Sequence, residues 1–325
     1  MFYPKKFKKG DTIEIISPSN GISKKNIVKL NKAIEYLEKS GYKVIEDANV
    51  RKNKKGASAD KNVRALELNK AFKNNESLLL LACTGGDYCI NILDLVNFNI
   101  YIKNPKWIQG HSDITPILYY VTTKLDIATM YSFNCKRIAK YNFLPTDMIS
   151  NNMELLNHIE VIQKNYKKII NDNGERRSSW KCINKVENVK GRIIGGCLES
   201  LKDIIGTKYD NTKEFISKYS NDGIIWYFDI SNMSNEDILR TMWQFKNSGW
   251  FNDTKLVLIG RLNEEISYTG VDLKSVLLDS IGDLNIPIII NTDIGHTDPV
   301  ISIVNGSIVE IVKKDKDYLI KTYFE

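Results

Sequence analysis

The sequence is short of histidine, paired cysteines and long apolar runs, and each shortage excludes a class of protein. Only three histidines occur in 325 residues, so an enzyme that needs a base near neutral pH has few candidates. The five cysteines are an odd number without a Cys-x-x-Cys pair, which predicts neither a disulfide framework nor a zinc site. No apolar run approaches the roughly 18 residues that span a bilayer. We therefore expect no metal, no other cofactor and no association with a membrane.

The charge balance is mildly basic, with 46 lysines and arginines against 39 acidic side chains and a net charge of +7. The basic residues do not gather with aromatics along one face, so we interpret them as a solvated surface rather than a nucleic-acid site. Residues 1–10 carry four lysines, but no apolar segment follows them. This pattern is not that of a signal peptide, and we expect a cytoplasmic protein.

Short apolar runs alternate with helical periodicity along most of the chain, which predicts α/β structure with a parallel sheet. Residues 1–150 form the first predicted domain, 151–184 a crossover linker that includes a polar loop over 171–179, and 185–325 the second domain. Strands are expected at 12–16, 42–45, 78–83, 107–109 and 127–133, and again at 191–196, 223–230, 255–259, 287–290, 308–312 and 318–323. Ligands of such sheets bind beyond the carboxyl ends of the strands.

Two polar segments fall at such strand ends in the first domain. Ser112 follows the strand at 107–109 and opens a helix, where free N–H groups and the helix dipole would favour a nucleophile. The Gly-x-Ser-x-Gly motif of hydrolases is absent, and on spacing alone a plain helix N-cap is the better interpretation. Gly85 and Gly86 follow another buried strand. Their N–H groups could face an oxyanion, or the pair could simply make a tight turn.

Two further candidates come from the second domain. His296 follows the apolar run 288–290 closely, so it should emerge just past a strand end, where a histidine can serve chemistry or structure. Asp229 ends the apolar run 224–228, and a carboxylate there must be solvated or paired. It could orient a histidine, as the acid of a triad does, or cap the turn through Ser231 and Asn232.

Taken together, these segments resemble the LD-carboxypeptidase family, the serine peptidases that include the microcin C self-immunity proteins. The resemblance runs over nearly the whole chain and is most specific at 110–115, Gly-His-Ser-Asp-Ile-Thr, where the family usually has Gly-Tyr-Ser-Asp-x-Thr. Other matching segments are 15–19, 56–72, 84–87, 195–198 with 206–207, and 291–296. The resemblance implies a flavodoxin-like N-terminal domain with a parallel sheet, a mixed barrel-like C-terminal α/β domain, and an active site in the cleft between them.

The resemblance also implies a role for each candidate residue. Ser112 matches the nucleophile and His296 the base, while the N–H groups of Asp113 and of Gly85 or Gly86 would meet the oxyanion. The acid position falls on Asp229, where the family normally has glutamate, so the carboxylate should retract by roughly 1.5 Å. Two other departures lie at 131–133, commonly a Gly-Pro pair in the family, and at Cys197, often asparagine.

The implied activity is that of a serine carboxypeptidase that cleaves an L,D peptide bond and releases terminal D-alanine from recycled muropeptides. Within the family the alternative is cleavage of a peptidyl-nucleotide antibiotic, in which Trp180 could stack on the base or could simply be a packed aromatic. A second class of hypothesis is a relative that binds muropeptides but does not cleave them. The change from glutamate to Asp229 in the triad is the reason to consider it. A small peptide is the expected partner, and the resemblance adds a possible homodimer.

Overall fold

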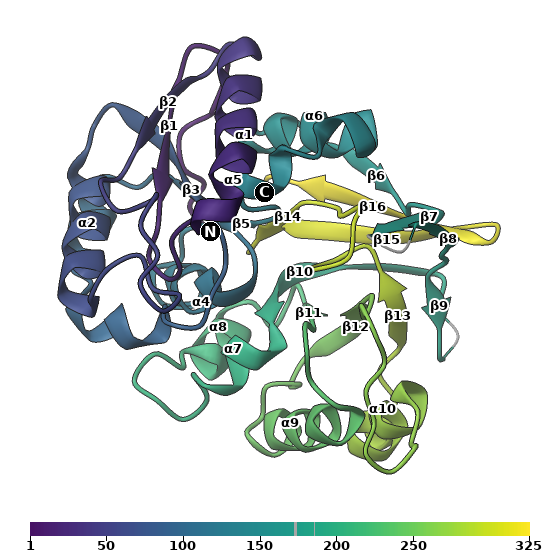
Figure 1. Cartoon of the computed structure of the whole chain (residues 1–325). Coiled ribbons are helices and arrows are strands. Elements are labelled where there is room, and N and C mark those ends of the chain that lie inside the picture. Colours follow the sequence, from purple (N-terminus) through teal and green to yellow (C-terminus); the bar gives the residue numbers. More distant parts are fainter. Residues whose placement is uncertain (172–173, 185) are drawn as a thin grey trace. The chain divides into compact units, whose positions relative to one another are not determined.

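The chain folds into two compact units, each built around its own β-sheet (Figure 1). The structure is a computed structural model that describes residues 1–171, 174–184 and 186–325. The first unit contains residues 1–161 and 302–305, and the second contains 162–301 and 306–325. Among the described helices, none combines the length and apolar character needed to cross a membrane.

The first unit holds a six-stranded sheet in the order β14-β5-β4-β3-β1-β2. Five strands run parallel, and β14 pairs antiparallel with β5 at one edge. Continuous apolar runs form the central strands because a parallel sheet is covered on both faces. The strands are β1 (Thr12–Ile16), β2 (Lys43–Glu46), β3 (Ser77–Ala82), β4 (Trp107–Gly110), β5 (Thr129–Tyr131) and β14 (Ile303–Asn305).

Helices cover both faces of this sheet. The chain moves outward from β1 to β2 and then back across β1 to β3, so right-handed crossovers place the two intervening helices on opposite faces. Figure 1 shows α1 and α2 on either side of the sheet. The helices are α1 (Ile27–Lys39), α2 (Lys61–Lys73), α3 (Phe98–Lys103), α4 (Thr115–Leu125), α5 (Cys135–Ile138) and α6 (Thr146–Leu156), with 3₁₀ turns at Lys24–Asn26, Ile90–Leu95, Ser112–Ile114 and Tyr141–Phe143.

The second unit holds an eight-stranded mixed sheet in the order β6-β16-β15-β10-β11-β12-β13-β9. Its four central strands, β10 to β13, are parallel, and the outer pairs are antiparallel. The strands are β6 (Ile162–Lys164), β9 (Lys181–Cys182), β10 (Asn188–Cys197), β11 (Ile224–Asp229), β12 (Thr254–Gly260), β13 (Ile288–Thr292), β15 (Ile308–Lys314) and β16 (Asp317–Tyr323).

Two helices of the second unit lie on one face of its sheet, because β11, β12 and β13 follow one another in a single direction. These are α9 (Asn235–Asn247) and α10 (Leu273–Ile281), which pack against each other in Figure 1. The shorter helices are α7 (Leu198–Lys202) and α8 (Thr212–Lys218), and a 3₁₀ turn spans Gly282–Leu284.

The segment 151–184, expected to cross between the domains, ends α6 in the first unit and then supplies short strands to the second. The prediction of a polar loop over 171–179 is wrong in part. A separate two-stranded antiparallel sheet forms there from β7 (Lys168–Asn171) and β8 (Gly174–Arg177), while residues 172 and 173 lie outside the described residues. Antiparallel backbone pairing does not need an apolar sequence, which is why composition alone did not indicate it.

Candidate active site

Ser112 lies on a strained turn at the carboxyl end of β4. It has a φ of +67° and begins the 3₁₀ turn that leads into α4. Such a conformation costs a non-glycine residue about 1–3 kcal/mol, and strain of this kind gathers at functional sites. The N-cap of α4 is Ile114, so the interpretation of Ser112 as a plain helix cap is wrong. The Ser112 N–H donates instead to the hydroxyl of Tyr131 at 3.1 Å, which gives one of the departures from the family pattern a structural role.

The glycine pair lies against Ser112. A Cβ atom added to Gly85 would stand 2.8 Å from the Ser112 Cβ and 2.9 Å from its Oγ. Gly86 has a φ of +155°, and a Cβ there would approach Ser19 Oγ and Asn20 to 2.3 Å. Both positions therefore require glycine, Gly85 because its backbone passes next to Ser112, and Gly86 because its backbone passes next to Ser19 and Asn20.

The side chain of Asp113 fastens this loop to the turn that carries Ser112. Its Oδ2 accepts from the hydroxyl of Ser19 and from the backbone N–H of Cys89 at 2.8 Å. The pKa of Asp113 is raised above its ordinary value because the effect of burial exceeds the opposite effect of these hydrogen bonds. The sequence motif indicated a role only for the N–H of Asp113. No local pattern pointed to Ser19, which is 94 residues away in the chain. The loop after β1, the glycine loop and the Ser112 turn are thus joined by one carboxylate.

Asp229 and His296 meet in the second unit. The Asp229 side chain, fully buried at the end of β11, places Oδ1 2.8 Å from Nδ1 of His296, whose side chain is 17% exposed. Aspartate is shorter than the glutamate of the family, yet the contact forms because the backbone comes close. Gly295 has a φ of +102°, and a Cβ there would lie 1.8 Å from Asp229 Oδ1. The missing side chain of Gly295 makes room for the short acid.

The turn after Asp229 is capped by another residue. Glu199 Oε1 accepts from the backbone N–H groups of Ser231 and Asn232, both at 2.8 Å. The two N–H groups of this turn therefore bond to Glu199, which favours the interpretation of Asp229 as the partner of His296. Cys197, which pairs with Asp229 in the β10–β11 register, donates its thiol to Glu199 Oε2 at 3.1 Å. Burial and the charges of Asp229 and Glu199 raise the pKa of Cys197 well above its ordinary value, so it stays a neutral thiol.

Trp180 is packed inside the second unit. It is only 4% exposed, its indole N–H donates to Asp293 Oδ2 at 2.8 Å, and its ring stacks on Tyr318 at a centroid distance of 5.8 Å. Of the two interpretations of Trp180, the structure therefore favours the packed aromatic over a side chain held ready to stack on a base.

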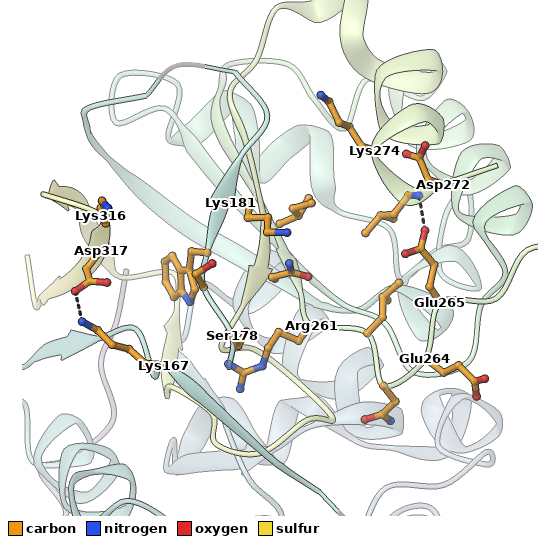
Figure 2. A pocket seen from close by; sticks show the side chains of 17 residues that line it. Lys167, Ser178, Lys181, Arg261, Glu264, Glu265, Asp272, Lys274, Lys316 and Asp317 are labelled. Atoms are coloured by element: carbon orange, nitrogen blue, oxygen red, sulfur yellow. Dashed lines mark hydrogen bonds and ion pairs between the residues drawn. The ribbon is translucent and has the colours of Figure 1, made fainter. Parts of the chain in front are cut away.

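Trp180 and Arg261 also line a cavity of about 1060 Å³ in the same unit. Figure 2 shows Lys167, Lys316 and Asp317 on one rim, with Lys167 paired to Asp317 at 2.9 Å. Carboxylates and one lysine stand on the opposite rim, namely Glu264, Glu265, Asp272 and Lys274. The cavity is thus rimmed by charges of both signs.

Comparison of the sequence with known protein families identifies the class of protein to which the chain belongs. The N-terminal domain model of the LD-carboxypeptidase family matches residues 13–132, and its C-terminal domain model matches residues 190–311. The matches cover most of the chain. The protein therefore belongs to the LD-carboxypeptidase family of peptidases.

Individual relatives are distant in sequence but similar along their whole length. The microcin C7 self-immunity protein MccF of Escherichia coli is 23% identical over 323 residues, covering 91% of this chain and 89% of its own. The structure of wild-type MccF matches with a TM-score of 0.86 at 21% identity and covers 99% and 98% of the two chains. An MccF-like protein from Bacillus anthracis gives 0.85 at 21% identity with full coverage of both chains. A muramoyltetrapeptide carboxypeptidase from Oxalobacter formigenes gives 0.78 at 20% identity over 96% and 99%. These structures establish the two-domain fold.

Proposed function

We propose that the protein is a cytoplasmic serine carboxypeptidase that cleaves an L,D peptide bond and releases terminal D-alanine from recycled muropeptides. The observation that carries the proposal is the 2.8 Å contact between Asp229 and His296, in a chain whose Ser112 lies on a strained turn against Gly85. The muramoyltetrapeptide carboxypeptidase among its structural relatives supports this substrate class.

In the proposed mechanism Ser112 Oγ attacks the scissile carbonyl carbon, and His296 takes the hydroxyl proton. Because Nδ1 of His296 faces Asp229, the proton goes to Nε2. The buried carboxylate of Asp229 then stabilises the imidazolium. The N–H of Asp113 and one from Gly85 or Gly86 receive the oxyanion.

Collapse of the tetrahedral intermediate breaks the C–N bond, and His296 returns the proton to the amine of D-alanine. An ester between Ser112 and the remaining tripeptide is left behind. Water, deprotonated by His296, attacks this ester, and the proton returns to Ser112 as the tripeptide leaves. No residue changes its net protonation over the cycle.

Replacement of Ser112 by alanine tests the proposal. We expect S112A to lower kcat for release of D-alanine from a synthetic L-Ala-γ-D-Glu-diaminopimelate-D-Ala tetrapeptide by about 10⁴-fold or more. Mass spectrometry of the products measures this release. The matched control is Ser150→Ala, because Ser150 is an exposed serine on α6 of the same unit. Undiminished turnover by S112A would contradict serine catalysis.

A second candidate substrate is a peptidyl-nucleotide. Structures of MccF match this chain with a TM-score of 0.86, one of a single-residue mutant in complex with adenosine monophosphate and one of MccF in complex with glutamyl sulfamoyl guanosine. Incubation of the wild-type protein with the tetrapeptide and with an aminoacyl sulfamoyl nucleoside, in parallel, separates the two substrates. If neither is cleaved, a fluorophosphonate probe decides whether Ser112 is activated at all. Ligand binding without labelling would identify a muropeptide-binding relative.

A further inference from the structure

One buried arginine in the second unit holds the loop 293–299, which has His296 at its centre. Arg261 follows β12 directly and is 1% exposed. Its guanidinium pairs with the carboxylate of Asp293 at the start of the loop. It also donates to the carbonyl oxygens of Thr297, at 3.2 Å, and of Pro299, beyond the histidine. A single side chain therefore contacts the loop on both sides of His296.

Asp293 collects further donors around its two oxygens. Oδ2 accepts from the indole N–H of Trp180 at 2.8 Å and from the backbone N–H of Tyr166 at 2.7 Å, while Oδ1 faces Arg261. The Asp293 side chain is completely buried and that of Arg261 is 2% exposed. A buried charge pair of this kind persists only where its remaining hydrogen-bonding positions are satisfied, as they are here for Asp293.

The segment after β12 makes one more hydrogen bond to this loop and one to the last residue of β13, just before it. The Thr297 hydroxyl donates to Asn263 Oδ1 at 2.8 Å, and the Arg261 N–H donates to the carbonyl oxygen of Thr292 at 3.0 Å. Loop residues on both sides of His296 are thus fixed to residues 261–263. The loop has little freedom to move except as a whole.

We propose that the Arg261–Asp293 pair, completed by Trp180, positions His296 against Asp229 and so sets the rate of the chemical step. This inference rests on the proposed function, in which His296 is the base. Buried ion pairs add little net stability, and their best-attested use is to specify one conformation. The conformation specified here is that of the loop that carries the imidazole, and a displacement of about 1 Å at a catalytic group costs about 100-fold in rate.

Two variants test the positioning role with different risks to folding. Arg261→Lys keeps the charge but loses the planar fork that reaches Asp293 and the two carbonyls together. Trp180→Phe keeps an aromatic ring and removes one hydrogen-bond donor. We expect kcat per active site to fall by about 100-fold in R261K and about 10-fold in W180F, with KM changed by less than about threefold. Titration with a fluorophosphonate counts the active sites, so loss of folded protein does not imitate the effect.

The matched controls are exposed residues of the same types on α9. Arg240, whose side chain is 78% exposed, gives the variant Arg240→Lys, and Trp243, which is 58% exposed, gives Trp243→Phe. Both controls should keep the wild-type kcat. If R261K fails to fold, W180F decides the question.

A spectroscopic measurement separates failure of this inference from failure of the proposed function. The proton that Nδ1 of His296 shares with Asp229 should give a low-field signal in the proton NMR spectrum, and Asp229→Asn should abolish it. We expect this signal to shift or broaden in R261K and W180F, and to be unchanged in the two controls, whether or not the protein cleaves peptides. An unmoved signal overturns the inference, even if kcat falls. An unchanged kcat per active site in a protein that does cleave the tetrapeptide overturns it as well.

Discussion

The candidate residues fall into two halves, one in each unit, and each half is held by a buried aspartate, but the partners of the two carboxylates differ. Asp113 in the first unit accepts from the Ser19 hydroxyl and the Cys89 N–H, which are neutral donors. Asp293 in the second unit accepts from the Arg261 guanidinium as well as from the neutral indole of Trp180. One half is thus aligned by dipoles on neighbouring loops, and the other by a charge pair.

This difference follows from what each half must hold. The Ser112 half brings three backbone turns together, and N–H groups and hydroxyls are the donors that turns supply. The His296 half must keep one loop at a fixed distance from a strand end, and the long fork of an arginine reaches both sides of that loop. We therefore expect the first half to depend on backbone shape and the second on side-chain length and charge.

Glycine substitutions should produce the largest effects and test both halves at once. In Gly295→Ala the new Cβ would lie 1.8 Å from Asp229 Oδ1, so the Asp229–His296 contact must open. We expect a loss of about 10⁴-fold in kcat/KM, as when the acid of a triad no longer holds its histidine. In Gly85→Ala the new Cβ would meet Ser112 at 2.8 Å, and we expect a loss of about 10²–10³-fold.

The control for both variants is Gly282→Ala, where a Cβ would make only ordinary contacts of 3.5 Å with Leu278. Steady-state kinetics on the tetrapeptide measure all three proteins. A Gly295→Ala protein with near wild-type kinetics would show that the close approach to Asp229 has no part in catalysis.

The candidate residues were predictable because they follow local apolar runs. The buried strand at 224–229 ends at Asp229, and the run at 288–290 comes just before His296. The partners that hold them were not predictable, because they are far away in the sequence. Trp180 and Asp293 are 113 residues apart, and Ser19 and Asp113 are 94 apart.

The edge strand β14 shows the same limit at the level of the fold. Residues 303–305 belong to the first unit, although the residues on either side of them belong to the second. They pair antiparallel with β5, where Val304 lies opposite Met130, 174 residues earlier in the chain. Three residues carry too little periodicity to predict a strand, and nothing in their composition indicates which sheet they join. Pairing across such a distance is decided by tertiary packing rather than by local propensity.

A medium-sized effect is expected at Asp113. Asp113→Ala removes the acceptor of the Ser19 hydroxyl and leaves the buried N–H of Cys89 without its partner. We expect the free energy of unfolding to fall by about 1–3 kcal/mol and kcat to fall with it, because the glycine loop loses its anchor. Asp113→Asn retains one acceptor oxygen and should lose less of both. Urea denaturation and tetrapeptide kinetics measure the two quantities, and equal behaviour of the alanine variant and the wild type would contradict an anchoring role.

The smallest expected effect concerns stability and a third carboxylate, Asp47, which lies near Glu14 and Glu67. Burial and the nearby charges of Glu14 and Glu67 raise the pKa of Asp47 to about 8. Between about pH 4 and pH 8 the folded protein therefore binds more protons at this group than the unfolded chain does. The free energy of unfolding must fall as the pH rises through that range. Asp47→Asn removes the titration and should be the more stable protein at pH 8, by about 2 kcal/mol, with the gain shrinking towards pH 4.

Urea denaturation at pH 5 and pH 8 measures this difference for wild type and D47N. The control is Glu38→Gln, the corresponding acid-to-amide change at an exposed position on α1. A gain in D47N that is equal at both pH values would mean that the side chain acts by shape alone. A gain that grows with pH would show that a carboxylate held beside other acids weakens the fold once it ionises. Asp293 differs in that its carboxylate pairs directly with Arg261.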